Sequence, residues 1–409
     1  MLFGGVLAIA ALRYVAKGWV QSQLIGPRYH FTYPYFEYVR PWSASASAPA
    51  ALMYLHVGGL FAAAVGLALG VRTRSCALLL ALGWCYVELI DRATYLNHYY
   101  LVCLMAFLLA CTPAELRYSS VPRWSLWVLR LQVAVVYVFA GIAKLNSDWL
   151  FHAQPLRIWL AAVSGSVGWL ATPACAFVAS WAGAAFDLCI VPALLWRRTR
   201  TAALCTAVLF HVTTGWLFPN GMFPWIMLSC VTLLLPADWP RRWLPLTAAH
   251  VPAPTPRGLP WLLGVHCVLQ VLVPLHHHVW ERESAWTGTG FDFAWKVMIA
   301  EKAGSVTFTT RDRSTGATQT VLPSALLTPL QQRALAQDPR LIIAFARELA
   351  RRRRAETGQD CAVFADAWAT LNGRPAQRLI APDVDLTRET LPAHVIVPLR
   401  ARAVQPSQL

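Results

Sequence analysis

Apolar segments long enough to cross a membrane fill the first 280 residues, and this feature restricts the possible folds more than any other. A helix needs roughly 20 mainly apolar residues to span the hydrocarbon core of a bilayer. By that rule the candidate spans are residues 1–20, 51–71, 75–95, 97–112, 124–143, 174–196, 201–218, 221–235 and 258–275. Because two of these are short, the sequence predicts a mainly α, polytopic membrane helix bundle of eight or nine spans.

Charged residues are concentrated in the last third of the chain. Residues 281–409 hold 17 Lys and Arg and 13 Asp and Glu, whereas the first 280 residues share only 18 and 7. Over the whole chain 57% of residues are hydrophobic and 13% are charged, which excludes an ordinary soluble globular protein. We therefore predict a transmembrane body, residues 1–280, followed by an extramembrane tail, residues 281–409.

The net charge of +15 could indicate nucleic-acid binding, but most basic residues of the body lie in short connections between spans. Cytoplasmic connections of membrane proteins are enriched in Lys and Arg. In a nine-span arrangement the connections after the even-numbered spans hold ten arginines: Arg72, Arg74, Arg117, Arg123, Arg197, Arg198, Arg200, Arg241, Arg242 and Arg257. The connections after the odd-numbered spans up to the seventh hold five basic residues: Arg28, Arg40, Arg92, Lys144 and Arg157. This bias predicts a cytoplasmic N-terminus, an extracytoplasmic tail and no nucleic-acid partner.

The hydrophobic pattern changes in the tail. Residues 306–310 and 318–322 alternate on either side of a Gly-containing connection, 311–316, which predicts a β-hairpin. Residues 328–355 have the period of one or two amphipathic helices, and residues 361–371 alternate again. The predicted tail is therefore an α+β domain.

Ionisable side chains inside the membrane body are functional candidates, because charge is expensive to bury in a bilayer. Lys144 is the most informative of them, since it ends the otherwise apolar segment 133–143. Such a lysine can simply extend to the membrane interface. Alternatively, Asn146 and Asp148 could hold the amine in place, and burial would favour its neutral form.

The remaining candidates also have a structural interpretation beside a functional one. Arg130 and Asp187 could pair with each other or with Glu88. A single intramembrane histidine often makes only a helix-to-helix hydrogen bond. Together with the lysine, however, His98 and His211 indicate a shared polar pocket.

A metal site is not predicted from the histidines at 276–278. Three adjacent residues on a regular helix cannot all face one ion, so we interpret this triplet as an interfacial helix end. Motifs of soluble enzymes, such as a phosphate-binding loop or HExxH, are also missing from the sequence.

Segments distributed over nearly the whole chain match a family of membrane proteins. In the body they are His30–Pro41, Leu96–Leu101, Ala140–Trp149 and Phe210–Pro224, and after residue 280 they are Trp286–Met298, Phe308–Gly316 and Phe364–Asp385. On these segments the chain resembles the horizontally transferred transmembrane (HTTM) domain family. Its best-known members are the vitamin K-dependent γ-glutamyl carboxylases.

The resemblance implies a carboxylase that acts on peptidyl glutamate and couples this to quinol epoxidation. Its cofactor would be vitamin K hydroquinone or menaquinol, with O2 and CO2 as co-substrates and no metal. Lys144 matches the catalytic lysine of the family, which takes a proton from the hydroquinone. Reaction with dioxygen then gives a strongly basic species that removes a γ-proton from glutamate, and the carbanion attacks CO2.

The same resemblance assigns further site residues. Asn97, His98 and His211 match residues at the quinol, and the two histidines are also catalytic candidates. Arg130, as a charged residue inside a span, is a further candidate for contacting the quinol.

The segment associated with the glutamate substrate matches residues 290–298. Within it Trp295 is the expected aromatic contact, and Phe293 and Met298 lie beside it.

The chain departs from the animal enzymes in three places. Ala143 replaces a second lysine, Ala300 replaces a histidine, and the animal enzymes continue past the position matched by Leu409. These departures leave two alternatives open: a quinol-dependent membrane enzyme of the same family without carboxylase activity, and a non-catalytic or transport protein. The expected partners are a glutamate-containing peptide or protein and the lipid bilayer, and the Ala- and Arg-rich composition suggests a bacterial inner membrane.

Overall fold

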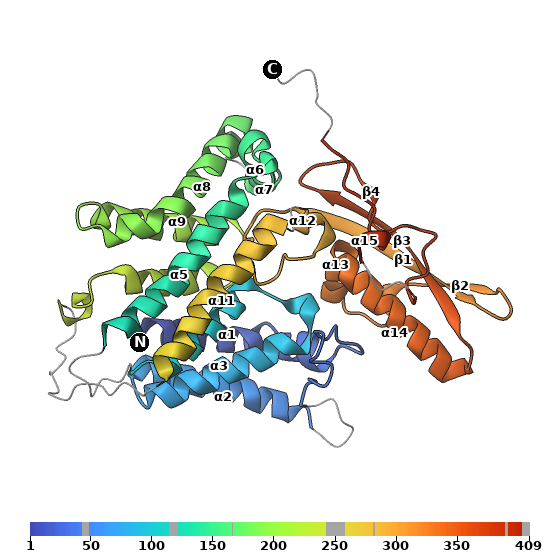
Figure 1. Ribbon diagram of the computed structural model, residues 1–409, viewed down its shortest axis with the longest axis horizontal. Helices are drawn as coiled ribbons and strands as arrows, with labels where there is room; N and C mark the ends of the chain where they lie inside the picture. Colours follow the sequence, from blue (N-terminus) through green and yellow to red (C-terminus); the bar gives the residue numbers. More distant parts are fainter. Residues whose placement is uncertain are drawn as a thin grey trace.

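The computed structural model describes residues 1–42, 49–113, 122–165, 167–242, 258–280, 283–388 and 392–402. These residues are mainly helical, and they form a helical body and a tail that contains one small sheet (Figure 1). Among the arginines counted for the orientation, Arg117 and Arg257 lie outside the described residues. The orientation of the chain in the membrane therefore stays a prediction.

Each predicted span coincides with a helix. They are α1 (Leu2–Ala16), α2 (Ala51–Leu69), α3 (Thr73–Ile90), α4 (Asn97–Cys111), α5 (Arg123–Lys144), α8 (Pro173–Leu195), α9 (Arg200–Leu217), α10 (Phe223–Val231) and α11 (Leu259–Trp280). Within the described residues, five of these, α2, α3, α5, α8 and α11, are long and apolar enough to cross a membrane. The membrane character of the body is thus supported, whereas the count of eight or nine spans is not confirmed.

Short elements connect the long helices. They are η1 (Val20–Ile25), η2 (Arg92–Thr94), α6 (Ser147–His152), α7 (Leu156–Val163), η3 (Gly168–Ala171), η4 (Thr232–Leu234), η5 (Trp239–Arg242) and α12 (Ser284–Thr287). Helix α6 begins with a cap, because Asn146 Oδ1 accepts a hydrogen bond of 3.0 Å from the Trp149 amide. This cap turns the chain sharply just after α5.

Helix α5 has α8 and α11 as packing partners, and Figure 1 shows α5 and α11 side by side. Gly141 allows the close approach of α8. A Cβ atom at this position would lie 2.6 Å from Leu188 Cδ2 and 3.2 Å from the Leu188 amide nitrogen. The glycine therefore brings the residue next to Leu188, Asp187, close to the last turn of α5.

The tail contains a four-stranded antiparallel sheet in the order β2-β1-β3-β4. Its strands are β1 (Lys302–Asp312), β2 (Thr318–Val321), β3 (Cys361–Leu371) and β4 (Gln377–Arg378). Helices α13 (Pro329–Gln337) and α14 (Pro339–Thr357) pack against β1 and β3, while η6 (Pro323–Ala325) and α15 (Pro392–Val395) are short. The predicted hairpin, helices and alternating strand are confirmed, so the α+β class of the tail was correct.

The tail is anchored on the body through buried contacts. Phe31 of the body packs into the core of the tail, where its ring centroid lies 6.3 Å from that of Phe345. Gln331 Nε2 donates hydrogen bonds of 2.7 Å to Asp91 Oδ2 and to the Tyr29 carbonyl. These contacts therefore fix the tail against the body.

Candidate functional site

Lys144 lies in the last turn of α5 and points into the body, with a side chain that is only 6% exposed. Its Nζ donates a hydrogen bond of 2.6 Å to Asp187 Oδ2 on α8. Weaker contacts join Nζ to the Ala140 and Val297 carbonyls, at 3.3 and 3.4 Å, and Nζ lies 5.2 Å from the centre of the Trp149 ring. The lysine side chain is therefore buried in the protein instead of extending to an exposed surface.

The prediction that Asn146 and Asp148 hold the amine is wrong. Asn146 caps α6 and donates to the Ala143 carbonyl at 2.7 Å. Asp148 instead faces the tail, where it accepts hydrogen bonds from Arg374 at 2.5 and 2.9 Å and from Asn372 at 3.0 Å. Burial raises the pKa of Asp148, but the hydrogen bonds from Arg374 and Asn372 outweigh burial and lower it overall. The polar turn after α5 therefore fastens the tail to the body.

Asp187 changes the expected state of the amine. A carboxylate at hydrogen-bond distance favours the charged form of lysine, whereas burial alone favours the neutral form. The expectation that burial alone sets the state of the amine left out this carboxylate partner. From the sequence, Asp187 was considered only as a partner of Arg130 or Glu88. The sequence feature that could have indicated its pairing with Lys144 is Gly141, because this glycine allows α8 to approach α5 closely.

A cavity of about 420 Å³ surrounds this ion pair, and we call it the lysine cavity. Its lining is mostly apolar and comes mainly from helices α5–α10 together with residues 297–298. His211 on α9 also lines it, and His211 Nε2 is 2.6 Å from the Tyr137 hydroxyl. His211 Nδ1 is buried and has no hydrogen-bond partner among the described residues. The structure thus brings Lys144 and His211 together as predicted candidates.

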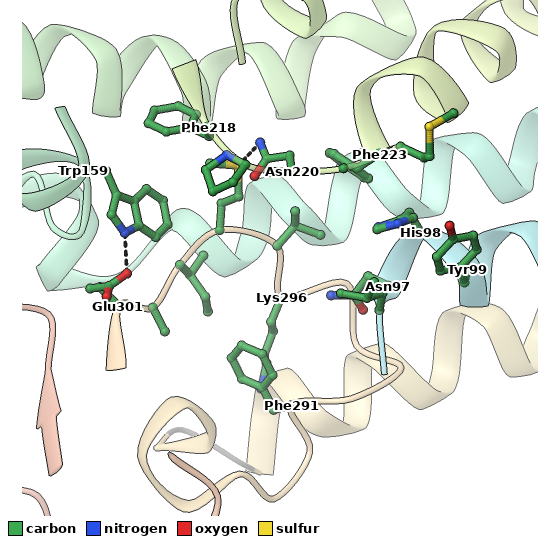
Figure 2. A pocket seen from close by; sticks show the side chains of 18 of the residues that line it. Asn97, His98, Tyr99, Trp159, Phe218, Asn220, Phe223, Phe291, Lys296 and Glu301 are labelled. Atoms are coloured by element: carbon green, nitrogen blue, oxygen red, sulfur yellow. Dashed lines mark hydrogen bonds between the residues drawn. The ribbon is translucent and has the colours of Figure 1, made fainter. Parts of the chain in front are cut away.

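A second cavity, of about 760 Å³, adjoins the first, and we call it the His98 cavity (Figure 2). Asn97 and His98 line it at the start of α4. Four residues belong to the lining of both cavities: Phe218, Phe223, Val297 and Met298. The ring centroids of His98 and His211 each lie 6.3 Å from that of Phe223. The shared pocket predicted for the two histidines is therefore divided into two compartments by a thin wall.

Only some residues of the segment predicted to bind glutamate line these cavities. Met298 lines both of them, and Asn220 Nδ2 lies 3.4 Å from its sulfur. Trp295 is 1% exposed and stacks on Tyr100 with a centroid distance of 5.1 Å, and Phe293 packs on the same ring at 4.9 Å. Neither aromatic residue lines either cavity.

Backbone strain is concentrated in that segment. Phe293, Trp295 and Met298 have φ values of 60°, 56° and 56°. Non-glycine residues rarely adopt this left-handed region, and they keep it only where the surroundings enforce it. Among the residues that line both cavities, Met298 is thus held in place by a constrained backbone.

Arg130 lies far from the other candidates. It precedes Lys144 by fourteen residues on the same helix, which corresponds to about 21 Å along the axis. Its guanidinium donates hydrogen bonds of 2.8 Å to the Leu233 and Leu235 carbonyls. The suggested pairing with Asp187 is wrong, and Arg130 lines neither cavity.

The histidine triplet at the end of α11 makes local contacts. His278 Nε2 donates to the Ala294 carbonyl at 3.1 Å, and His276 stacks on Trp280 with a centroid distance of 5.1 Å. In the described part of the chain, no group of three His, Cys, Asp or Glu side chains is arranged to hold a metal ion.

The fold and the site define a membrane protein that buries a lysine and carboxylate pair in an apolar cavity. Two family descriptions match the chain: the HTTM domain over residues 1–239, and the vitamin K-dependent gamma-carboxylase, lumenal domain, over residues 258–399. The chain therefore belongs to the HTTM family and, within it, to the vitamin K-dependent γ-carboxylase family. No solved structure matches it.

Proposed function

We propose that this protein is a vitamin K-dependent γ-glutamyl carboxylase, which uses vitamin K hydroquinone or menaquinol, O2 and CO2 to carboxylate peptidyl glutamate. The observation that carries the proposal is the buried pair of Lys144 and Asp187 inside an apolar cavity. The two family matches supply the reaction class, because they cover both the body and the tail.

The lysine cavity suits a quinol. Its mostly apolar walls suit the ring and the isoprenoid tail of a quinol. Two polar groups, the Lys144 amine and His211 Nδ1, could form hydrogen bonds with the quinol hydroxyl groups. When bound, the quinol would supply the reducing equivalents and, with O2, the strong base that the reaction requires. Lys144 and His211 would hold it, and the apolar walls would exclude water from the site.

Lys144 acts in this proposal as the general base. Its neutral amine accepts a proton from a quinol hydroxyl, and Asp187 stabilises the ammonium that results. Asp187 also fixes the direction of the amine, since the 2.6 Å hydrogen bond restricts its rotation. Tyr137 orients the imidazole of His211 through its hydroxyl.

The peptide would reach the site from the tail side through the His98 cavity. That cavity adjoins residues 296–301, which lead directly into β1 of the tail. With the N-terminus in the cytoplasm, as the arginine bias predicts, the peptide would enter from outside a bacterial inner membrane.

A second candidate function has one observation in its favour. Ala300 lines the His98 cavity at the position where the animal enzymes have a histidine. The cavity thus lacks a titratable group there, as expected of a quinol-dependent enzyme that does not carboxylate.

The direct test is to incubate the purified protein with reduced vitamin K, labelled bicarbonate and a glutamate-containing peptide, and to analyse the products by mass spectrometry. The proposal predicts a peptide that gains one labelled carboxyl group, together with vitamin K epoxide. Quinol turnover without peptide modification would favour the second candidate. If neither product forms under conditions where an animal carboxylase is active, both enzymatic proposals fail.

A further inference from the structure

Arg13 is a cation in the last turn of the apolar helix α1. It is half-buried, and its Nε is buried without a hydrogen-bond partner among the described residues. Its guanidinium carbon lies 5.9 Å from the centre of the Trp19 ring, and no ion pair joins it to any described carboxylate. A cation in apolar surroundings is costly unless it is paired. Arg13 therefore has unused capacity to bind an anion.

Arg13 lines the His98 cavity, and two neighbouring groups there also have free hydrogen-bonding capacity. Neither ring nitrogen of His98 makes a hydrogen bond to any residue that the structure describes. Asn97 uses its Oδ1 to accept from the Tyr95 hydroxyl at 3.0 Å, which leaves its amide N–H groups unused within the same residues. A guanidinium, an amide and an imidazole together suit a carboxylate, since charge-assisted hydrogen bonds are the strongest available.

The other charged groups of this cavity are already engaged. Glu301 accepts a hydrogen bond of 2.5 Å from Trp159 Nε1, and Figure 2 shows this pair at the opposite end of the cavity from His98. Lys296 donates to the His277 carbonyl at 3.1 Å and to Ser284 Oγ at 2.6 Å. An anion entering the cavity would therefore be attracted to the end formed by Arg13 and His98.

We propose that Arg13 binds the side-chain carboxylate of the substrate glutamate in the His98 cavity. This inference rests on the proposed function and adds a specificity-determining residue to it. The cavity volume of about 760 Å³ accommodates a peptide side chain, and its wall of Phe218, Phe223, Val297 and Met298 adjoins the lysine cavity. A glutamate bound by Arg13 would thus lie next to the compartment of the base.

Equilibrium binding of a fluorescent peptide to the full-length protein, without quinol, tests the proposal. Two peptides are compared that differ only in Glu or Gln at the acceptor position. Because hydrogen bonds to charged groups contribute about 1.5–3 kcal/mol, the wild type should prefer the Glu peptide roughly tenfold to hundredfold. Arg13→Gln should lose this preference, and Arg13→Lys should keep only part of it, because a single ammonium cannot reproduce the planar donor pair.

Lys17→Gln is the matched control, since it removes the same charge from an exposed position one turn further along. It should leave the preference unchanged. Because the two peptides differ only in the acceptor carboxylate, a difference in their affinity shows that Arg13 binds the peptide. Binding of bicarbonate or of a lipid headgroup by Arg13 would affect both peptides equally. A wild type without preference, or an Arg13→Gln variant that retains it, overturns the proposal. If Arg13→Gln is not recovered folded, an undiminished preference in Arg13→Lys overturns it instead.

The binding measurement separates this proposal from the proposed function. Normal carboxylation with an unchanged preference in Arg13→Gln would refute the role of Arg13 alone. An Arg13-dependent preference in a protein that does not carboxylate the peptide would refute the carboxylase and leave the carboxylate site intact.

Discussion

The two ends of α5 each carry a cation, but the two cations have different partners: Arg130 is half-buried, and Lys144 is buried. Near the start, Arg130 is satisfied by two backbone carbonyls, Leu233 and Leu235, where the η4 helix ends. At the end, Lys144 is held by one carboxylate and faces a cavity. Arg130 thus stabilises a helix terminus, whereas Lys144 is held in a position that a ligand can reach. The two cations thus differ in their partners, backbone carbonyls for Arg130 and a carboxylate beside a cavity for Lys144, and this difference separates a structural role from a chemical one.

The strongest test of this contrast is Lys144→Arg. Arginine keeps the positive charge beside Asp187 but cannot release its proton at any accessible pH. We expect the fold to be retained and quinol oxidation to fall by about 10²–10⁴-fold, the usual contribution of a general base. Epoxide formation and thermal unfolding of the purified protein would be measured together. Near-normal epoxide formation would mean that Lys144 is structural, like Arg130.

Asp187→Asn should have the next largest effect. The amide keeps a hydrogen-bond acceptor for Lys144 but does not stabilise the ammonium, so we expect quinol oxidation to decrease by roughly one to two powers of ten. Steady-state rates should fall without a change in the KM for the peptide. Asp148→Asn is the control, because that carboxylate binds Arg374 of the tail instead. An equal loss of quinol oxidation in both variants would argue against a special role of Asp187.

Arg130→Gln should reduce stability and leave the specific activity unchanged. The variant loses charged hydrogen bonds to two carbonyls, each of which contributes about 1.5–3 kcal/mol. A lower midpoint of thermal unfolding in detergent is the expected result. A loss of activity per folded molecule would show that Arg130 acts at the quinol site after all.

Lys302, at the start of β1, is a buried cation of the tail, and its replacement should have the smallest effect. It donates a hydrogen bond of 2.5 Å to the Trp286 carbonyl, and burial lowers its pKa to about 7. Because the folded state then binds fewer protons than the unfolded state between about pH 7 and the ordinary pKa of lysine, stability should rise with pH over this range. Lys302→Met should flatten this dependence in denaturant titrations at several pH values. An unchanged slope would mean that Lys302 is charged throughout.

Much of the fold followed from local patterns in the sequence. Runs of apolar residues predicted the helices of the body, and alternation at 306–310 and 361–371 predicted β1 and β3. The span count was harder to predict, because α1, α4 and α10 are apolar but short.

Individual residues of the site could be predicted from the sequence, but the contacts between them could not. Motifs indicated Lys144, His98 and His211, but sequence spacing contains no information on contacts between distant helices. The pairing of Lys144 with Asp187, 43 positions later, depends on the close packing that Gly141 permits. Likewise, the wall around Phe223 that separates the two histidines arises only in the folded chain.

Chemical rescue of Lys144→Ala tests the central claim most directly. This variant leaves a space beside Asp187 that a small primary amine can occupy. We predict that it is inactive alone and that added amines partly restore epoxide formation, with a pH profile that follows the pKa of each amine. Near-normal epoxide formation by Lys144→Ala without any amine would contradict the assignment of Lys144 as the base.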